Sequence, residues 1–328
     1  MDNYIPPYDI TEEMLTLTAE IMELLGELKH VSDLEKLPRL RRVSRIKSIH
    51  SSLAIENNTL TLQQVTDVIE GRRVLGPEDD IIAVKNAFEV YKMLDEIDPL
   101  SVDDLVKSHG IMMKGLVEEA GQIRTSPVGV INQKGDVIHV APPAVMASGL
   151  LYKLFDWLNN SSAPMLIKSS VFHYEFEFIH PFRDGNGRMG RLWQTALLSM
   201  WKPIFRWIPI ESIIKDNQEE YYNAITLSTS EGKSNRFIVF MLGVIKSALV
   251  DITKDTRNHY NHINNQIAAL MAVVESYPMT LTELMQKVGL KSRDTFRKNY
   301  IIPALEAGLI GMTEPDKPRS KNQRYFKI

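Results

Sequence analysis

The sequence predicts a mainly α-helical protein: a helical bundle that carries one β-hairpin, followed by a small winged helix-turn-helix domain. Three observations support this fold class. Apolar residues recur at steps of three or four over most of the 328-residue chain, which is the period of an amphipathic helix. One stretch near the middle is rich in β-branched residues instead, and the C-terminal part combines two short helical patterns with a basic, proline-containing segment.

The first half of the chain supplies several helix signals. Apolar spacing predicts helices over residues 11–29 and about 38–56, and Pro38 suits the first turn of the second. Thr61 and Gln64 form a capping-box pair that starts another helix. Ser101 with an acidic residue three positions on is a weaker version of the same signal, before a helix over 105–116.

Residues 121–143 break the helical pattern. Several β-branched residues lie there on either side of a plausible turn, Lys134-Gly135-Asp136, which predicts a hairpin over about 128–140. Pro142 and Pro143 end it. Periodic apolar residues then predict further helices over 150–158, 165–178, 188–200, 217–228 and 235–250.

The C-terminal part follows a polar stretch, 253–265, which is either a linker or a connecting helix. Thr280 and Glu283 form a second capping box. Ser292 is a good N-cap for a helix to about 307, kinked at Pro303. The order of two helices and a basic hairpin predicts a winged helix-turn-helix. We therefore expect three regions: an N-terminal helical region (1–100), a core (101–252) and a winged helix domain (262–328).

Composition excludes several classes of protein. Apolar residues make up 44% and charged residues 24% of the chain, which is ordinary for a folded domain. The chain has no cysteine, so disulfide frameworks and thiolate sites are excluded. We see no apolar run of the roughly 18 residues that a membrane span needs, and no secretory signal at the N-terminus. The expected protein is cytoplasmic and has no membrane association.

The charge is distributed unevenly. The net charge is −3, but residues 291–328 carry nine Lys/Arg against four Asp/Glu, so this segment is +5 and the rest of the chain −8. A basic winged helix is typical of phosphate contact with DNA. A solvated basic face on a protein-interaction or dimerisation module is an equally good interpretation. DNA binding through residues 291–328 and a homodimer both stay open.

The segment that carries chemical information spans residues 180–191, HPFRDGNGRMGR. An apolar helix ends at His180, because Pro181 disfavours helix in the residue before it. The following Gly-Asn-Gly loop permits positive φ, so that successive backbone N–H groups can converge on an anion. A new helix starts at about Arg188, and its N-terminus also favours an anion. Arg188 and Arg191 share one face of that helix, an arrangement that suits a polyphosphate.

Two further side chains of this segment fit group transfer. Asp184 lies next to the predicted phosphate site, where a lone carboxylate is a typical Mg²⁺ ligand. His180 titrates near neutral pH and suits the role of a general base. Taken singly, a structural histidine, a plain turn and a solvated arginine face are the more common explanations. Their combination within twelve residues indicates a phosphoryl- or nucleotidyl-transfer site.

The same segment resembles the signature of the Fic family (filamentation induced by cyclic AMP), His-x-Phe-x-Asp/Glu-Gly-Asn-Gly-Arg-x-x-Arg, at all eight fixed positions. The resemblance covers about residues 30–250 and implies a Fic-type helical bundle. It also implies transfer of AMP from ATP, with Mg²⁺, to a hydroxyl side chain of a target protein. In that family role His180 is the general base, Asp184 binds Mg²⁺ and Phe182 is an apolar anchor for the loop.

The resemblance assigns the remaining signature residues to the nucleotide. Gly185, Asn186 and Gly187 would hold the α- and β-phosphates, Arg188 the β-phosphate and Arg191 the γ-phosphate. The hairpin at about 128–140 is similar to the family's flap, which aligns a target by β-strand addition through its backbone.

A second motif resembles the family's inhibitory sequence, Ser/Thr-x-x-x-Glu-Gly/Asn. It runs from Ser52 to Asn57 and includes Glu56, within an inhibitory helix at about 38–57. Glu56 falls at the C-terminal end of a predicted helix, where the dipole disfavours an anion, so it would gain from a cationic partner. The resemblance implies that this partner is Arg191 and that the pair blocks the γ-phosphate position within the same chain.

Two other functions remain as alternatives. One is a Fic-type transferase of another phosphate-containing group. The other is a nucleotide-sensing transcriptional regulator that binds DNA through its winged helix. Of the remaining residues, His173 is expected in the core, Tyr221 and Tyr222 beside the adenine, and His109 and His139 carry no assignment.

Overall fold

The computed structural model describes residues 4–31, 38–131, 137–306, 308–318 and 320–328. The chain divides into two compact units, Met1–Thr253 and Lys254–Ile328. Within the described residues, we find no helix that combines the length and the apolar character needed to cross a membrane.

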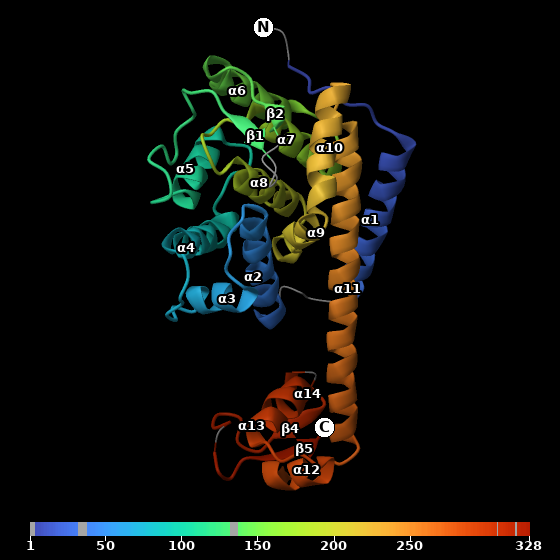
Figure 1. The fold of residues 1–328 in the computed structure, drawn as a ribbon. Helices are drawn as coiled ribbons and strands as arrows, with labels where there is room; N and C mark the ends of the chain where they lie inside the picture. Colours follow the sequence, from blue (N-terminus) through green and yellow to red (C-terminus); the bar gives the residue numbers. More distant parts are fainter. Residues whose placement is uncertain (1–3, 32–37, 132–136, 307, 319) are drawn as a thin grey trace. The chain divides into compact units, whose positions relative to one another are not determined.

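The first unit is built almost entirely from helices (Figure 1). In chain order they are α1 (Glu12–Val31), α2 (Pro38–Ile55), α3 (Leu62–Ile69), α4 (Glu78–Lys92), η2 (Met93–Asp95), α5 (Val102–Met112), α6 (Ala144–Asn160), α7 (Met165–Ile179), α8 (Asn186–Trp201), η3 (Pro203–Trp207), α9 (Ile210–Asp216), α10 (Gln218–Glu231) and α11 (Asn235–Met271). The mainly α-helical prediction is confirmed.

Helices α7 and α8 pack against each other in the centre of this unit. Both are buried along nearly their whole length, so α7 shows little of the one-sided pattern of a surface helix. The largest fully buried side chains include Phe172, Phe176 and Trp193 of these two helices. The loop between α7 and α8 therefore starts and ends on deeply buried helices.

The local helix signals are confirmed at the residue level. Thr61 caps α3 through a reciprocal capping box with Gln64, and the Ser101 side chain accepts from the backbone N–H of Asp104 at the start of α5. The last helix of the first unit extends beyond its predicted end at about residue 250, which decides between the two interpretations of residues 253–265. Helix α11 continues to Met271, so the polar stretch 253–265 belongs to a connecting helix and not to a flexible linker.

The predicted hairpin consists of β1 (Gly129–Ile131) and β2 (Val137–Val140), which pair antiparallel with Gly129 opposite Val140. The register shifts by a bulge between Val130 and Ile131. The predicted turn residues 134–136 lie outside the described residues.

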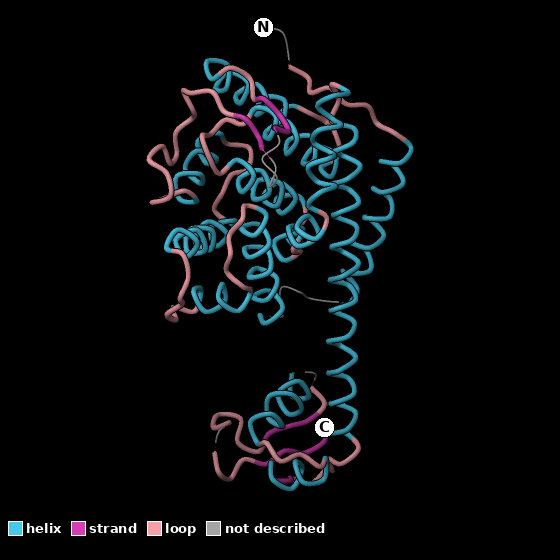
Figure 2. Tube along the Cα trace, viewed as in Figure 1, coloured by secondary structure: helices cyan, strands magenta, loops and turns pink. Residues whose placement is uncertain are grey.

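The second unit has the winged helix-turn-helix architecture that was expected. It contains β3 (Met279–Thr280), α12 (Leu281–Val288), α13 (Arg293–Phe296), η4 (Arg297–Ile301), α14 (Ile302–Glu306), β4 (Ile310–Met312) and β5 (Arg324–Lys327). The strands form an antiparallel sheet in the order β3-β5-β4, drawn in magenta in Figure 2. The second capping box, Thr280 with Glu283, opens α12 as predicted.

The helix that begins after Ser292 is interrupted just before Pro303. Segment η4 is a π-helical turn, in which the N–H of Ile302 bonds to the carbonyl of Arg297. Proline lacks an N–H, and its ring crowds the carbonyl four residues earlier. A wider turn at this point relieves that crowding, so the expected kink takes the form of a π-helix.

Candidate active site in the loop between α7 and α8

The loop begins with an unusual backbone conformation at His180. His180 is the C-cap of α7 and has φ 48° and ψ 61°, in the left-handed region. Such a conformation costs a residue with a side chain roughly 1–2 kcal/mol. The His180 N–H still closes the helix by donating to the Phe176 carbonyl at 2.9 Å. The turn directs the chain, and with it the imidazole, into the site.

Arg124 holds this helix end in place. The side chain is 4% exposed. Its Nε donates to the His180 carbonyl at 2.7 Å, and its Nη2 donates to the carbonyls of Ile179 and Pro142 at 3.2 and 2.6 Å. Its Nη1 donates to the Ser126 carbonyl at 3.1 Å. One guanidinium therefore ties the histidine to the segments on both sides of the hairpin.

Phe182 anchors the loop, as expected, but it does so against a histidine. Its ring is fully buried and stacks on His109 at 3.7 Å with an interplanar angle of 4°. The Gly121 N–H donates to His109 Nδ1 at 2.9 Å, so the imidazole hydrogen resides on Nε2, 2.9 Å from the Asp184 carbonyl. Burial lowers the pKa of His109 to about 4. His109 is thus a neutral support for the loop.

The two loop residues at the start of α8 brace the turn. The Asn186 side chain accepts from the Phe182 N–H at 2.9 Å and donates to the Phe182 carbonyl at 2.8 Å. Gly185 has φ 82°, and a Cβ there would lie 2.6 Å from the sulfur of Met113. Glycine is therefore required at this position both for conformation and for space.

The carboxylate of Glu56 lies at the N-terminus of α8. Arg191 Nη2 donates to Glu56 Oε1 at 2.8 Å and to the Ser52 carbonyl at 2.9 Å, and Nε donates to Ser52 Oγ at 3.1 Å. A Cβ on Gly187 would lie 2.4 Å from Glu56 Oε1. The carboxylate therefore occupies the anion-favouring position at the start of the helix.

Two opposing effects set the electrostatics of this contact. Burial is the largest single effect and lowers the pKa of Arg191, but Glu56, Tyr221 and Glu177 together outweigh it, and the net shift is upward. The guanidinium is 1% exposed and the carboxylate 30% exposed. Arg191 therefore stays charged, and Glu56 can be rehydrated without unfolding the core.

Asp184, at the exposed side of the loop, pairs with the buried side chain of Arg188. Asp184 is 55% exposed, and its Oδ1 accepts from the Gly185 N–H at 2.6 Å and from Arg188 Nη2 at 3.2 Å. In the described part of the chain no three His, Asp or Glu side chains are grouped to hold a metal ion. A lone exposed carboxylate fits Mg²⁺ that arrives with phosphates and keeps its waters.

A cavity of about 190 Å³ opens beside these groups. Seven of the nine predicted site residues line it: Glu56, His180, Asp184, Gly185, Asn186, Gly187 and Arg191. Arg188 lines a neighbouring cavity that shares Glu56 and Asp184 with the first. Ser52 is buried behind Arg191. Tyr221 and Tyr222 are on the wall, where the adenine was expected.

The surroundings of His180 favour its neutral form. Burial lowers its pKa, while the charges of Glu177 and Glu56 act in the opposite direction. Its Nδ1 lies 3.3 Å from the Glu177 carbonyl. A hydrogen on Nδ1 donated to that carbonyl leaves Nε2 as the proton acceptor. His173, by contrast, is a core residue as expected, fully buried and hydrogen-bonded to Gln194.

Sequence reasoning missed three residues of this site: His109, Arg124 and Glu177. Their partners lie 75, 56 and three residues away, respectively. The only signal in the sequence for Glu177 was a carboxylate three residues before His180. The other two carried no signal, because only the fold brings them to the loop.

The basic side chains of the second unit are exposed. Arg293 and Lys298 are exposed beside α13, and Lys317, Lys321 and Arg324 are exposed in the segment after β4. Arg319, also expected in this basic set, lies outside the described residues. Arg297 Nη2 donates to the Pro318 carbonyl at 2.6 Å, so this arginine joins the helix to the wing.

Comparison with known proteins matches both parts of the chain. The Fic/DOC family model matches residues 99–198. The model of the C-terminal domain of filamentation induced by cAMP protein Fic-like matches residues 265–326. A crystal structure of a Fic family protein from Desulfovibrio desulfuricans G20 is 44% identical and has a TM-score of 0.74 over 99% of this chain and 98% of that one.

More distant relatives have named activities. The protein adenylyltransferase fic-1 of Caenorhabditis elegans is 28% identical over 219 residues, which cover 62% of this chain and 41% of that protein. The protein adenylyltransferase Fic of Aedes aegypti is 26% identical over 318 residues, 89% of this chain and 58% of that one. This chain thus spans about half the length of these relatives. The family signature, the fold and the 44% identity over nearly the whole chain agree: the chain belongs to the Fic/DOC family and carries a Fic-like C-terminal domain.

Proposed function

We propose that this chain is an autoinhibited protein adenylyltransferase, which transfers AMP from ATP to a hydroxyl side chain of a target protein or of itself. One observation carries the proposal: a single cavity gathers a neutral histidine, the amides of a glycine-bearing loop at a helix N-terminus, and a buried guanidinium. The names of the distant relatives support AMP as the transferred group.

Each group has a role in the proposed reaction. The acceptor hydroxyl gives its proton to Nε2 of His180 while its oxygen forms a bond to the α-phosphorus. The bond from that phosphorus to the oxygen of the β-phosphate breaks, and pyrophosphate leaves. The loop amides and Arg191 hold the charge of the phosphates. Mg²⁺ bound by Asp184 and the phosphates would supply further charge neutralisation.

Autoinhibition follows from the Glu56 contact. A carboxylate on Arg191 withholds that guanidinium from ATP and adds a negative charge near the triphosphate. ATP would then bind in an unproductive position until Glu56 moves away. Because Glu56 is the more exposed partner, the motion requires rehydration of a carboxylate and leaves Arg191 in place.

The test is AMP incorporation from radiolabelled ATP, with mass spectrometry of the labelled protein. We expect His180→Ala to lower incorporation about 10²–10⁴-fold, the usual effect of losing a general base. Glu56→Gly should raise it about 10–100-fold, since a charge-assisted contact contributes about 1.5–3 kcal/mol. Glu96→Gly, the same change at an exposed residue, is the matched control.

The outcomes separate the proposed function from its alternatives. A mass gain other than that of AMP would indicate transfer of another phosphate-containing group. Bound but unconsumed ATP in Glu56→Gly would indicate a nucleotide sensor. Equal labelling by the wild type and Glu56→Gly would refute autoinhibition.

The basic winged helix supports DNA as a second binding partner, alongside the enzymatic function. Exposed Arg293, Lys298 and Lys321 would contact phosphates, and such binding weakens steeply with salt. A salt titration of the full chain with duplex DNA tests this, with Lys298→Gln and Lys321→Gln expected to reduce the salt dependence. No binding at low salt would leave protein interaction as the role of this unit.

A further inference from the structure

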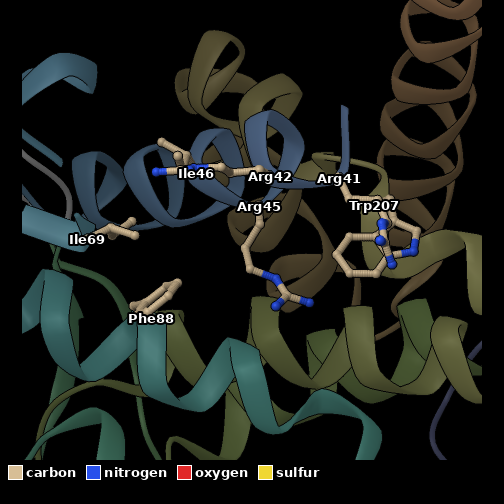
Figure 3. A pocket seen from close by; sticks show the side chains of 7 residues that line it. All are labelled: Arg41, Arg42, Arg45, Ile46, Ile69, Phe88 and Trp207. Atoms are coloured by element: carbon tan, nitrogen blue, oxygen red, sulfur yellow. The ribbon is translucent and has the colours of Figure 1, made fainter. Parts of the chain in front are cut away.

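A second, larger cavity of about 420 Å³ lies at the opposite end of α2 from Glu56. Its basic side consists of Arg41, Arg42 and Arg45 of α2, and its apolar side includes Ile69 of α3, Phe88 of α4 and Trp207 of η3. Figure 3 shows Arg45 reaching between these elements, with Ile69 and Phe88 to one side and Arg41 and Trp207 to the other. A cavity of this volume is in the range of small-molecule sites, roughly 300–1,000 Å³.

The charges that face this cavity are largely uncompensated. Helix α2 contains four arginines and one lysine and no Asp or Glu, and basic residues at a helix N-terminus oppose its dipole. Arg42 pairs with Glu70. Within the described residues, Arg41 and Arg45 form no ion pair with an acidic side chain. Two guanidiniums on one side of a cavity are thus available to an anion.

The arginines also have unfilled hydrogen-bonding capacity. Among the described residues, the Nε groups of Arg41, Arg45 and Arg206 are buried without a hydrogen-bond partner. Burial lowers the pKa of Arg45 from its usual range; Asp95 opposes this shift, and the charges of Arg41 and Arg206 add to it. Buried polar groups in folded proteins are nearly always paired. Arg41 and Arg45 both line the cavity, so two such groups at one cavity point to a missing ligand.

The aromatic residues define the rest of the ligand. Trp207 lies under both guanidiniums, 4.6 Å from Arg45 and 5.3 Å from Arg41 to the ring centroid, and orients them. Phe88 and Ile69 offer an apolar surface on the other side of Arg45. We propose that this cavity binds a small aromatic anion, with its phosphate or carboxylate on Arg41 and Arg45 and its ring against Phe88 and Ile69.

The position of the cavity suggests what such binding does, and this second step rests on the proposed function. Arg45, Ser48 and Ser52 follow one another at steps of three and four residues, so they share a face of α2, and Glu56 follows directly after the last residue of that helix. Ser52 and Glu56 hold Arg191 at the far end of that face. The cavity is formed with this contact in place. A ligand that joins α2 to η3 and α4 therefore favours the inhibited position of α2.

The first experiment measures binding by calorimetry on the full chain, with phenyl phosphate as the probe. We expect Arg45→Gln to weaken binding at least tenfold. Arg236→Gln, the same change at an exposed residue of α11, should bind like the wild type. Inorganic phosphate should bind at least fivefold more weakly than phenyl phosphate, and neutral benzyl alcohol should not bind.

Three results would overturn the site. If phenyl phosphate does not bind to the wild type, the proposed site does not exist. If it binds to Arg45→Gln as tightly as to the wild type, it binds at the active-site loop instead. A melting temperature of Arg45→Gln well below that of the wild type in the absence of anion would show that the arginine serves the fold. Equal affinity for inorganic and phenyl phosphate would reject the aromatic part of the proposal.

The second experiment tests the coupling through ATP affinity. Saturating phenyl phosphate should weaken ATP binding to the wild type about three- to tenfold and leave ATP binding to Arg45→Gln and Glu56→Gly unchanged. If ATP binds but phenyl phosphate does not alter its affinity, the coupling is wrong and the binding site stands. If Glu56→Gly binds no ATP, the proposed function and the coupling fail together, whatever the result for phenyl phosphate.

Discussion

Arginine side chains lie at both ends of helix α2, but their hydrogen bonding differs. At the C-terminal end, Arg191 is 1% exposed, and its Nε and Nη2 donate to Ser52 and Glu56. At the N-terminal end, Arg41 and Arg45 face a cavity with buried Nε groups that find no partner among the described residues. A guanidinium that is paired within the chain supports a conformation, whereas one with an unpaired N–H at a cavity is suited to an external anion.

The largest expected difference between the two ends is in stability. Arg191→Gln should lower the free energy of unfolding by about 2–3 kcal/mol, since it leaves buried partners unpaired. Arg45→Gln should change it by less than about 0.5 kcal/mol, because lost stacking on Trp207 is offset by reduced repulsion from Arg41. Urea denaturation of both variants measures the free energy of unfolding. Equal decreases in the two variants would contradict the proposed difference between the two ends.

A smaller effect is expected from Ser52. Ser52→Ala removes the acceptor for Arg191 Nε and should destabilise the inhibited position of α2 by about 1 kcal/mol. AMP incorporation should therefore rise about fivefold. Ser51→Ala is the matched control, because the Ser51 hydroxyl lies 3.1 Å from that of Ser212. A rise of the same size in Ser51→Ala would mean that α2 is loosened generally, without a specific role for the Ser52 contact.

The smallest effect is a displacement of the pH profile. Burial lowers the pKa of His180, and Glu56 partly offsets this shift. A general base must be unprotonated, so a lowered pKa preserves activity as the pH falls. In Glu56→Gly this offset is absent. The apparent pKa of the acid limb of the kcat/KM profile, measured at saturating MgATP, should therefore lie below the usual histidine value of about 6.5. An apparent pKa at or above that value would contradict the proposal that His180 acts as a neutral base.

Local signals in the sequence were the most reliable guide to the fold. Thr61 with Gln64 and Thr280 with Glu283 form the predicted capping boxes, because a capping box depends on residues three apart. The extent of α11 stayed open, since a polar stretch such as 253–265 gives no apolar period that distinguishes a connecting helix from a linker.

The site was predictable where chemistry is concentrated in a short segment. Residues 180–191 indicated a phosphate-binding site by themselves. The resemblance supplied Glu56 as the partner of Arg191, and the two side chains form an ion pair in the structure. The ring stack of His109 on Phe182 was not predictable. Nor was the basic cavity, because its walls come from four separate elements and their buried N–H groups become evident only in three dimensions.

The four carbonyl contacts of Arg124 have a mechanical consequence for catalysis. In the proposed function, a target strand would be added to the hairpin, which Ser126 and Pro142 flank. Force applied to the hairpin by an incoming polypeptide therefore reaches, through one planar cation, the carbonyl of His180. If the proposed function holds, a single side chain would link the binding of the target to the alignment of His180, and a poorly bound peptide would also misalign the imidazole.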